Sequence, residues 1–304
     1  MFNLIRMNLF RLIHTKGVIV VFCLLMGFAA LSSFESVYDK KQMQDVMDGK
    51  TELQESKPEE GITEEEGDNP IGIYIDTPES TDGYLMDYIY MYCEEISSGI
   101  VLIFIFIGAV IFFRGDERDG FLKNIAGQTK HRYNILISKL VVIAIYTFVC
   151  MVCYMVVEFV AYKAGWLIGV KINLGINYIP EVFNVAFGVK HIPEALGFFA
   201  LEYILYMAFT GGLLLITEVT KSTATAITIG LLGMLGFGIF FSALVRKVFS
   251  TDFDISKYYI STNISNLDLG MDRDIVILAL CIGIVFFIIY NVLNVLWFSR
   301  KDIV

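Results

Sequence analysis

The chain alternates between long apolar blocks and polar connections. Six blocks contain almost no charge: Gly17–Phe34, Ser97–Phe113, Leu140–Ala161, Ala195–Thr217, Thr223–Val245 and Ile275–Phe298. A helix needs about 20 apolar residues to cross the roughly 30 Å hydrocarbon core of a bilayer, because lipid offers the backbone no hydrogen-bond partners. The pattern therefore predicts an all-α polytopic membrane protein with six transmembrane helices.

Residues 1–16, which precede the first block, predict an amphipathic helix. Apolar side chains share one face at helical spacing: Phe2, Ile5, Leu9, Leu12 and Ile13. Polar and basic side chains fall on the opposite face: Asn3, Arg11 and His14. Such a helix lies in the membrane interface with its basic face toward anionic lipid. A charged leader that only fixes the topology is the alternative.

The distribution of Lys and Arg predicts the orientation. Basic residues are denser in four segments than elsewhere: 1–16, 114–139, 218–222 and 299–304. The positive-inside rule therefore places both termini in the cytoplasm of a plasma-membrane protein. The other connections are then external: 35–96, 162–194 and 246–274. Of these, 162–194 is rich in apolar residues and predicts short interfacial helices.

Composition excludes several function classes. Hydrophobic residues make up 56% of the chain, charged residues only 18%, and the net charge is −9. These values disagree with a soluble enzyme and with a nucleic-acid partner, which would need a basic patch. No phosphate-binding loop occurs, because Gln44 stands where the motif that ends in Gly49-Lys50-Thr51 needs a glycine. The sequence therefore predicts neither catalysis nor a cofactor bound by this chain.

The external segment Glu35–Ile96 is strongly acidic, with 18 Asp and Glu residues and 4 lysines. One interpretation is electrostatic capture of a cationic substrate or peptide. The other is a solvated acidic loop without a ligand, which is the usual role of a charge run.

Polar residues within the spans are the default candidates for function. Glu158 and Glu202 lie near the outer ends of their spans, where they either face a substrate path or reach the interface. Asn291 and Asn294 lie one turn apart in the last span, and such amides join neighbouring helices. The fifth span carries glycines that permit close helix packing, within the subunit or across a dimer: Gly230, Gly233, Gly236 and Gly238.

The connection Arg114–Lys139 predicts a short helix with an apolar patch. Asp116, Glu117 and Asp119 are expected to open it, because negative charge suits the start of a helix. Phe121, Leu122 and Ile125 then form the patch. A helix this short needs a partner for that patch, either lipid or another protein.

These features resemble a known family. The run Glu117–Asn124, the following Arg132, and Lys139-Leu140 at the entry of the third span are similar to the permease subunit of type-2 ATP-binding-cassette exporters. The ending Phe298–Asp302 resembles the family's usual ending. The resemblance covers most of the chain, including the leader, the six spans and the short link Glu218–Ser222. The acidic external segment is longer than in minimal members.

The resemblance implies a mechanism and partners. A coupling helix would dock on a separate ATPase subunit through Asp116, Glu117, Gly120, Phe121, Leu122, Asn124 and Ile125. That partner would bind ATP and Mg²⁺, and a second permease, identical or a sister chain, would complete the complex. The expected substrate is an amphipathic peptide, a drug or a lipid-like molecule. A membrane-embedded sensor or scaffold with an acidic ligand-binding exterior is the alternative.

Overall fold

The computed structural model describes residues 1–47, 92–118, 133–168, 192–234, 242–243, 247, 255–267 and 273–300. Nearly all of these residues are helical, and no strand occurs among them. The predicted all-α architecture is therefore confirmed for the described part of the chain.

The long helices follow the apolar blocks. They are α1 Phe2–His14, α2 Lys16–Met47, α4 Ile100–Arg118, α6 Tyr133–Ile168, α7 Ile192–Thr220 and α11 Arg273–Arg300. Shorter elements complete the order: α8 Thr223–Leu232, the 3₁₀ helix η3 Ile255–Tyr258 and α10 Ile260–Ser265.

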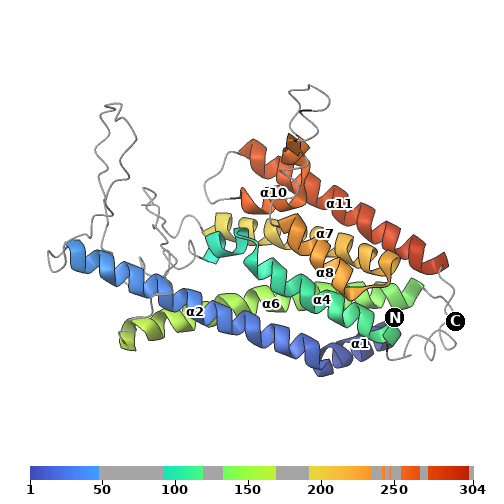
Figure 1. The fold of residues 1–304 in the computed structure, drawn as a ribbon, viewed down its shortest axis with the longest axis horizontal. Coiled ribbons are helices and arrows are strands. Elements are labelled where there is room, and N and C mark those ends of the chain that lie inside the picture. The colour runs from blue at the N-terminus through green and yellow to red at the C-terminus, as the bar shows by residue number, and fades with distance from the viewer. Residues whose placement is uncertain are drawn as a thin grey trace.

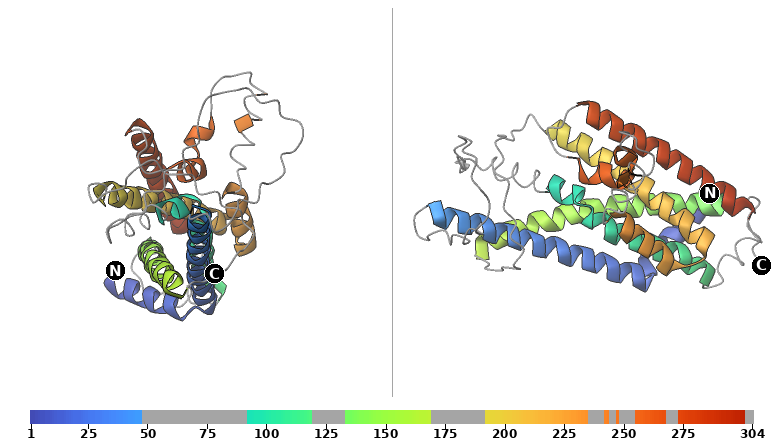
Figure 2. Two further views of the ribbon diagram at one scale, coloured as in Figure 1. Left: turned by 90° about the vertical axis from the view of Figure 1, so that its left-hand side faces the viewer. Right: turned by 45° about the horizontal axis from the view of Figure 1, so that its top comes forward.

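The helices form an elongated bundle of two groups (Figure 1). In one group α2 and α1 pack on α6, and in the other α11, α8 and α10 pack on α7. α4 contacts both groups, through α2 and α6 on one side and α7 and α8 on the other. The left view in Figure 2, which looks along the bundle from one end, shows the α7 group above the α6 group.

The bundle has two distinct ends, named here for the rest of the text. The termini end carries α1, the start of α2, the last turns of α4 and α7, and the C-terminal end of α11 (Figure 1). The opposite end carries the last turns of α2 and α6 and the first turns of α4, α7 and α11. This arrangement follows from the alternating direction of successive long helices.

Four of the described helices are long and apolar enough to cross a membrane: Lys16–Tyr38, Tyr133–Gly165, Ala195–Thr220 and Arg273–Ser299. They coincide with the first, third, fourth and sixth predicted spans. The second and fifth predicted spans appear as the shorter apolar helices Ile100–Gly115 and Thr223–Leu232. The fifth predicted span continues beyond the described residues, so the count of six stays a proposal.

The structure corrects the expected start of a separate helix after the second span. Asp116 and Glu117 belong to the last turn of α4, which continues to Arg118. The favourable interaction of acidic side chains with a helix N-terminus therefore does not apply to these two residues. The pattern was misread because hydropathy marks where a helix leaves the apolar layer, whereas the helix itself continues into polar sequence.

A break at Gly99 separates α4 from a short helical segment at 92–97. Gly99 has a φ of +76°, in the left-handed region that favours glycine. A Cβ at this position would also collide with the side chain of Met234. α4 therefore begins at Ile100, three residues after the predicted start of the second span at Ser97. The turn at Gly99 separates the helical segment 92–97 from α4.

The leader forms the predicted helix, α1, and one of its polar residues fixes how it docks on α6. Leu12 is buried within the protein, whereas Phe2 and Ile13 of the predicted apolar face are 78% and 59% exposed, which a helix in the membrane interface allows. The polar Asn8 is buried instead, and its Nδ2 donates to Ser138 Oγ on α6 at 2.8 Å. A specific hydrogen bond between helices thus fixes how α1 docks on α6.

Glycine permits close packing of α8 within the subunit. Gly230 is buried, and a Cβ built on it would lie 2.8 Å from Leu213 Cδ1 and 2.9 Å from Phe106 Cε2. Both distances are shorter than ordinary van der Waals contact, so a larger residue here would require the side chains of Leu213 and Phe106 to shift. Gly236 and Gly238 lie outside the described residues.

Candidate functional site

The two predicted carboxyl groups lie inside the bundle. Glu158 on α6 and Glu202 on α7 each have 0% exposed surface. Neither carboxyl group makes a hydrogen bond to any described residue. Buried ionisable groups are usually paired or hydrogen-bonded, because an unsatisfied polar atom in an apolar environment costs about 1–3 kcal/mol. Thr147 and Thr210 also have buried hydroxyl groups without a hydrogen-bond partner among the described residues, but a carboxyl group costs more to bury because it can be charged.

A third carboxyl group, that of Glu95, is the centre of a polar cluster with Glu158. Glu95 Oε2 accepts hydrogen bonds from Tyr154 Oη on α6 and from Ser32 Oγ on α2, the latter at 3.0 Å. The charges of Glu158 and of Glu35 on α2 also act on Glu95. The segments 92–97, α2 and α6 thus meet around carboxyl groups.

The pKa of the Glu95 carboxyl is raised above its ordinary value. Burial is the main cause, and the negative charge of Glu35 adds to it. The hydrogen bonds from Tyr154 and Ser32 act in the opposite direction, because they stabilise the carboxylate. The carboxyl of Glu95 can therefore take up a proton more readily than an exposed glutamate.

Hydrogen bonds to the backbone hold this cluster in place. Ser33 Oγ donates to the carbonyl oxygen of Glu158 at 3.0 Å, which joins α2 to α6. Tyr92 Oη donates to the carbonyl oxygen of Met151 at 3.1 Å, which joins the 92–97 segment to α6. The carboxyl groups therefore sit on a framework that is fixed independently of their own ionisation.

Glu202 is connected to the same segment from the other group of helices. Tyr206, one turn along α7 from Glu202, donates through Oη to the carbonyl oxygen of Ile96 at 2.7 Å. Ile96 is the residue after Glu95. The 92–97 segment thus contacts α6 beside Glu158 and α7 beside Glu202, at the opposite end of the bundle.

The two predicted asparagines lie elsewhere and behave differently. Asn294 is fully buried, and its Nδ2 donates to the carbonyl oxygen of Gly211 on α7 at 2.9 Å. Asn291 is partly exposed, and its Nδ2 donates within α11, to the carbonyl oxygen of Phe287. Both lie in the half of α11 that leads to the termini end, so they do not join the carboxyl cluster.

At the termini end, two contacts hold the expected coupling connection to the bundle. Lys139 on α6 is fully buried, and its Nζ lies 3.4 Å from the carbonyl oxygen of Phe113 on α4. Arg114 Nη2 donates to the carbonyl oxygen of Lys221, in the turn between α7 and α8, at 2.7 Å. The side chains of Asp116 and Glu117, and all of Gly120, Phe121, Leu122, Asn124 and Ile125, lie outside the described residues.

The carboxyl cluster was only partly accessible from sequence. Glu158 and Glu202 stand out because they interrupt apolar blocks. Glu95, Tyr154 and Ser32 give no such signal, since Glu95 belongs to an acidic segment and the other two are common within spans. The only clue was that Glu95 lies two residues before an apolar block.

The cluster has the chemistry of a cation or proton site. It offers carboxylate and hydroxyl oxygens in an apolar surrounding. Within the described ranges, no group of three or more His, Cys, Asp and Glu side chains is placed to hold a metal ion. Carboxylate and hydroxyl oxygens can accept hydrogen bonds from an ammonium or guanidinium group, and a carboxylate can take up a proton.

The sequence was compared with known proteins. It matches no family model, and no curated protein matches it. The family suggested by the motifs is therefore carried forward only as a proposal.

Proposed function

We propose that this chain is the permease subunit of an ATP-binding-cassette exporter and that it moves an amphipathic, cation-bearing peptide or drug across the plasma membrane. The observation that carries the transport part of this proposal is the burial of Glu158 and Glu202 without hydrogen bonds to described residues. Ionisable groups within membrane helices mark substrate and ion paths by default.

The energetic argument favours a ligand over a packing role. If Glu158 served only to pack α6 against its neighbours, a leucine would fill the same space without an unsatisfied polar group. The stability lost by retaining a carboxyl group is recovered when a cation of the substrate neutralises it, because a charge pair in an apolar environment is strong.

The ATP-dependent part rests on the motif resemblance and on the anchoring of the connection 114–139. The Lys139–Phe113 contact joins the two helices that flank this connection. The Arg114–Lys221 hydrogen bond joins it to the α7–α8 turn. A partner that pulls on this connection would therefore move α4, α6 and the α7–α8 turn together, as alternating access between two rigid states requires.

The first experiment tests the ATPase partner. The tagged chain is purified from its native membrane, and bound proteins are photolabelled with azido-ATP. We expect a labelled partner with the wild type and loss of its transport-coupled activity in F121E/L122E. The matched control F2E/I13E places the same charges on exposed apolar positions of α1. Absence of any labelled protein in the wild-type sample would favour the sensor or scaffold.

The second experiment tests the carboxyl groups within the same complex. A Lys/Leu-rich amphipathic peptide is titrated while ATPase activity is measured. We expect E158Q and E202Q to raise the half-saturating peptide concentration about tenfold or more, because each removes a buried charge that would pair with the cation. D274N is the control, because Asp274 is an exposed acidic residue at the same end of the bundle as the two buried carboxyl groups. Unchanged half-saturation in both variants would contradict the assigned path.

A further inference from the structure

Glu95 and Glu158 come from different segments, but their carboxyl groups form a pair. Tyr154 and Glu158 are four residues apart on α6, so their side chains share one face of that helix. The hydroxyl group of Tyr154 donates to Glu95 Oε2, which holds the Glu95 carboxyl against this face. The negative charge of Glu95 acts directly on the carboxyl group of Glu158. The two groups therefore titrate as one site and not independently.

The described charged groups that face this pair from α2 and α7 are acidic. Glu35 on α2 adds its negative charge to the surroundings of Glu95. α7 brings two titratable side chains to the segment 92–97, those of Glu202 and Tyr206, and the Tyr206 hydroxyl donates to the backbone of this segment. The other titratable side chains on the segment itself are Tyr92, Cys93 and Glu94.

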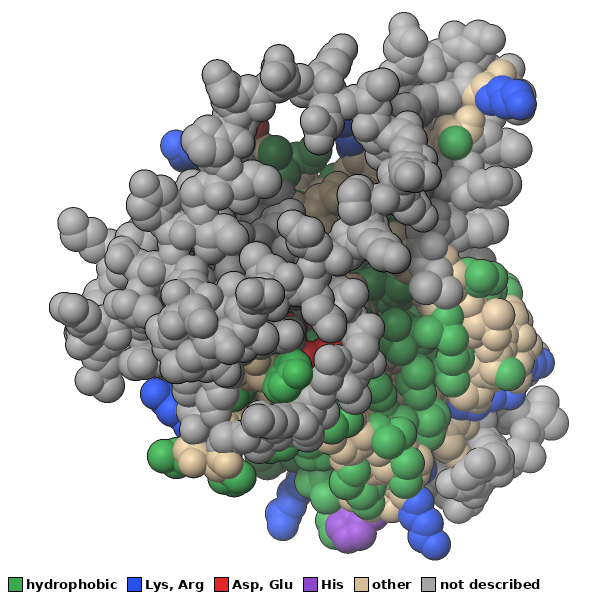
Figure 3. Space-filling model, turned by 60° about the vertical axis from the view of Figure 1, so that its left-hand side comes forward, with side chains coloured by type: hydrophobic (Ala, Val, Ile, Leu, Met, Phe, Trp, Pro, Cys, Tyr) green, Lys and Arg blue, Asp and Glu red, His purple; other side chains and the backbone are tan. Residues whose placement is uncertain are grey.

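One cation on α6 follows the pair along the chain. Lys163 is five residues after Glu158, and its Nζ lies 5.9 Å from the centre of the Phe159 ring. At 3.6 residues per turn, this spacing places Lys163 about 140° around the helix from Glu158. On the face drawn in Figure 3, small patches of acidic side chain show between hydrophobic ones. The described part of α6 therefore places no cation on the face that carries the pair.

Hydrogen bonding distinguishes the two carboxyl groups. Glu95 Oε2 accepts from Tyr154 and from Ser32, whereas neither oxygen of the fully buried Glu158 has a partner among the described residues. A carboxylate costs far more to bury than a neutral carboxyl group, and two neighbouring carboxylates are rarely ionised together. A proton on the pair removes this cost, and Glu158, which has no donor, gains most from it. The raised pKa of Glu95 agrees with this argument.

We propose that Glu95 and Glu158 share one proton and that a cationic group of the substrate displaces this proton when it binds. The inference rests on the proposed function, because the substrate supplies the displacing cation. In this step the O–H bond of a carboxyl group breaks and the proton passes to water. The carboxylate that remains accepts hydrogen bonds from the ammonium group of the substrate. The net charge of the buried site is therefore the same before and after binding, which keeps the cost of burying charge low.

The test is a calorimetric titration of the purified full chain with an N-acetylated Lys/Leu-rich amphipathic peptide. The binding enthalpy is measured near neutral pH in phosphate and in Tris, because the difference between buffers of unlike ionisation enthalpy gives the number of protons released. We expect about one proton for each bound peptide where the pair is protonated. Binding should accordingly weaken by up to about tenfold for each unit that the pH falls.

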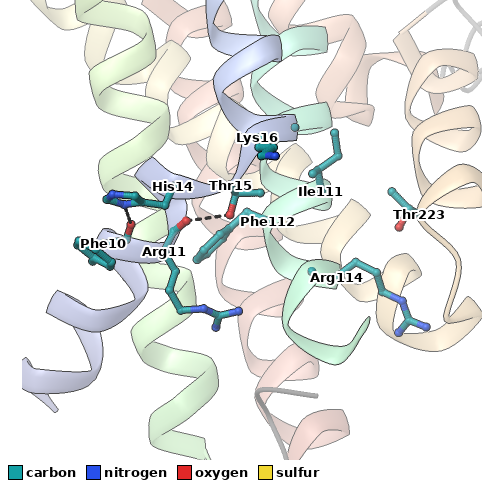
Figure 4. A pocket seen from close by; sticks show the side chains of 11 residues that line it. Phe10, Arg11, His14, Thr15, Lys16, Ile111, Phe112, Arg114 and Thr223 are labelled. Carbon is teal, nitrogen blue, oxygen red and sulfur yellow. Dashed lines mark hydrogen bonds between the residues drawn. The ribbon is translucent and has the colours of Figure 1, made fainter. Parts of the chain in front are cut away.

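Matched variants assign the proton to the pair. E158Q keeps the side-chain length but has no titrating proton, so the release should fall to nearly none. E95Q should lower the release, because the repulsion between two carboxylates that retains the proton is gone. H14Q is the control and should leave the release unchanged. Histidine ordinarily titrates near neutral pH, and His14 lies at the termini end, away from the pair, with its Nδ1 2.7 Å from the carbonyl oxygen of Phe10 (Figure 4).

Infrared difference spectra of the wild type follow the same proton without any substitution. The ligand-free protein should show the carbonyl stretch of a protonated carboxyl group, and the peptide should remove this band. Absence of the band before the peptide is added would overturn this inference alone. Peptide binding without proton release, unchanged release in E158Q or E95Q, or loss of release in H14Q would do the same. A peptide that does not bind would refute the substrate path of the proposed function, and the displacement with it.

Discussion

Replacing Glu158 with leucine should stabilise the isolated protein. The side chain is fully buried, and neither carboxyl oxygen has a hydrogen-bond partner among the described residues. The hydrogen bond from Ser33 goes to the backbone carbonyl of Glu158 and persists in any variant. Leucine fills a similar volume without a polar group. Since burying an unsatisfied polar group costs about 1–3 kcal/mol, E158L should raise the free energy of unfolding by that amount.

The assay is reversible unfolding by sodium dodecyl sulfate in mixed micelles, followed by helical circular dichroism. N294L is the comparison variant, because Asn294 is equally buried and its Nδ2 bonds to the carbonyl of Gly211 between two helices, while its Oδ1 has no hydrogen-bond partner among the described residues. Such bonds contribute about 0.6 kcal/mol on average and up to about 1.7 kcal/mol in membrane proteins. In N294L the loss of this bond opposes the gain from removing the unpartnered Oδ1, so N294L should raise the free energy of unfolding less than E158L does.

A loss of stability in E158L would refute this reasoning. It would mean that the carboxyl group is held by a stabilising partner, and the argument that the site is reserved for a substrate cation would then lose its basis. E158Q separates charge from shape, since glutamine keeps the side-chain length. A gain in E158L with little change in E158Q would indicate that lost polarity, more than lost charge, is responsible.

Three further predictions follow from other contacts. G99A should lower the free energy of unfolding by about 1–3 kcal/mol in the same assay, because alanine disfavours a φ of +76°; an unchanged value would contradict the break before α4. S138A removes the hydrogen bond from Asn8 and should loosen α1, seen as faster proteolysis after Arg6 with a loss of about 1 kcal/mol; unchanged cleavage would show that apolar contacts alone dock α1. Burial raises the pKa of Glu95, so its contribution to stability is complete below the ordinary value of 4.5 and is lost as pH rises through the raised pKa; E95Q should flatten this decline in thermal midpoint, and an identical pH profile would contradict it.

Hydropathy alone predicted the fold class, because a bilayer strongly restricts which segments can cross it. A membrane helix must be long and apolar, so blocks such as Leu140–Ala161 and Ile275–Phe298 reveal α6 and α11 directly. The ends of the helices were harder to predict, because hydrogen bonding within a helix continues after the sequence becomes polar. α2 accordingly extends to Met47, well past the predicted end of its span at Phe34.

The faces of the helices could not be read from the sequence. A helix that is apolar on all sides has no pattern that distinguishes a neighbour from lipid. The cluster around Glu95 illustrates this, since it brings together Ser32, Tyr154 and Glu158 from segments far apart in the chain. The burial of Asn8 was missed for a related reason, because its partner Ser138 lies 130 residues away.

The buried ammonium group of Lys139 has a consequence for biosynthesis. Lys139 lies at the entry of the third predicted span, where the carbonyl oxygen of Phe113 accepts a hydrogen bond from its Nζ. α4 precedes α6 in translation, so that acceptor exists before the lysine needs it. The two helices can therefore pair at this end of the bundle as soon as α6 has been synthesised.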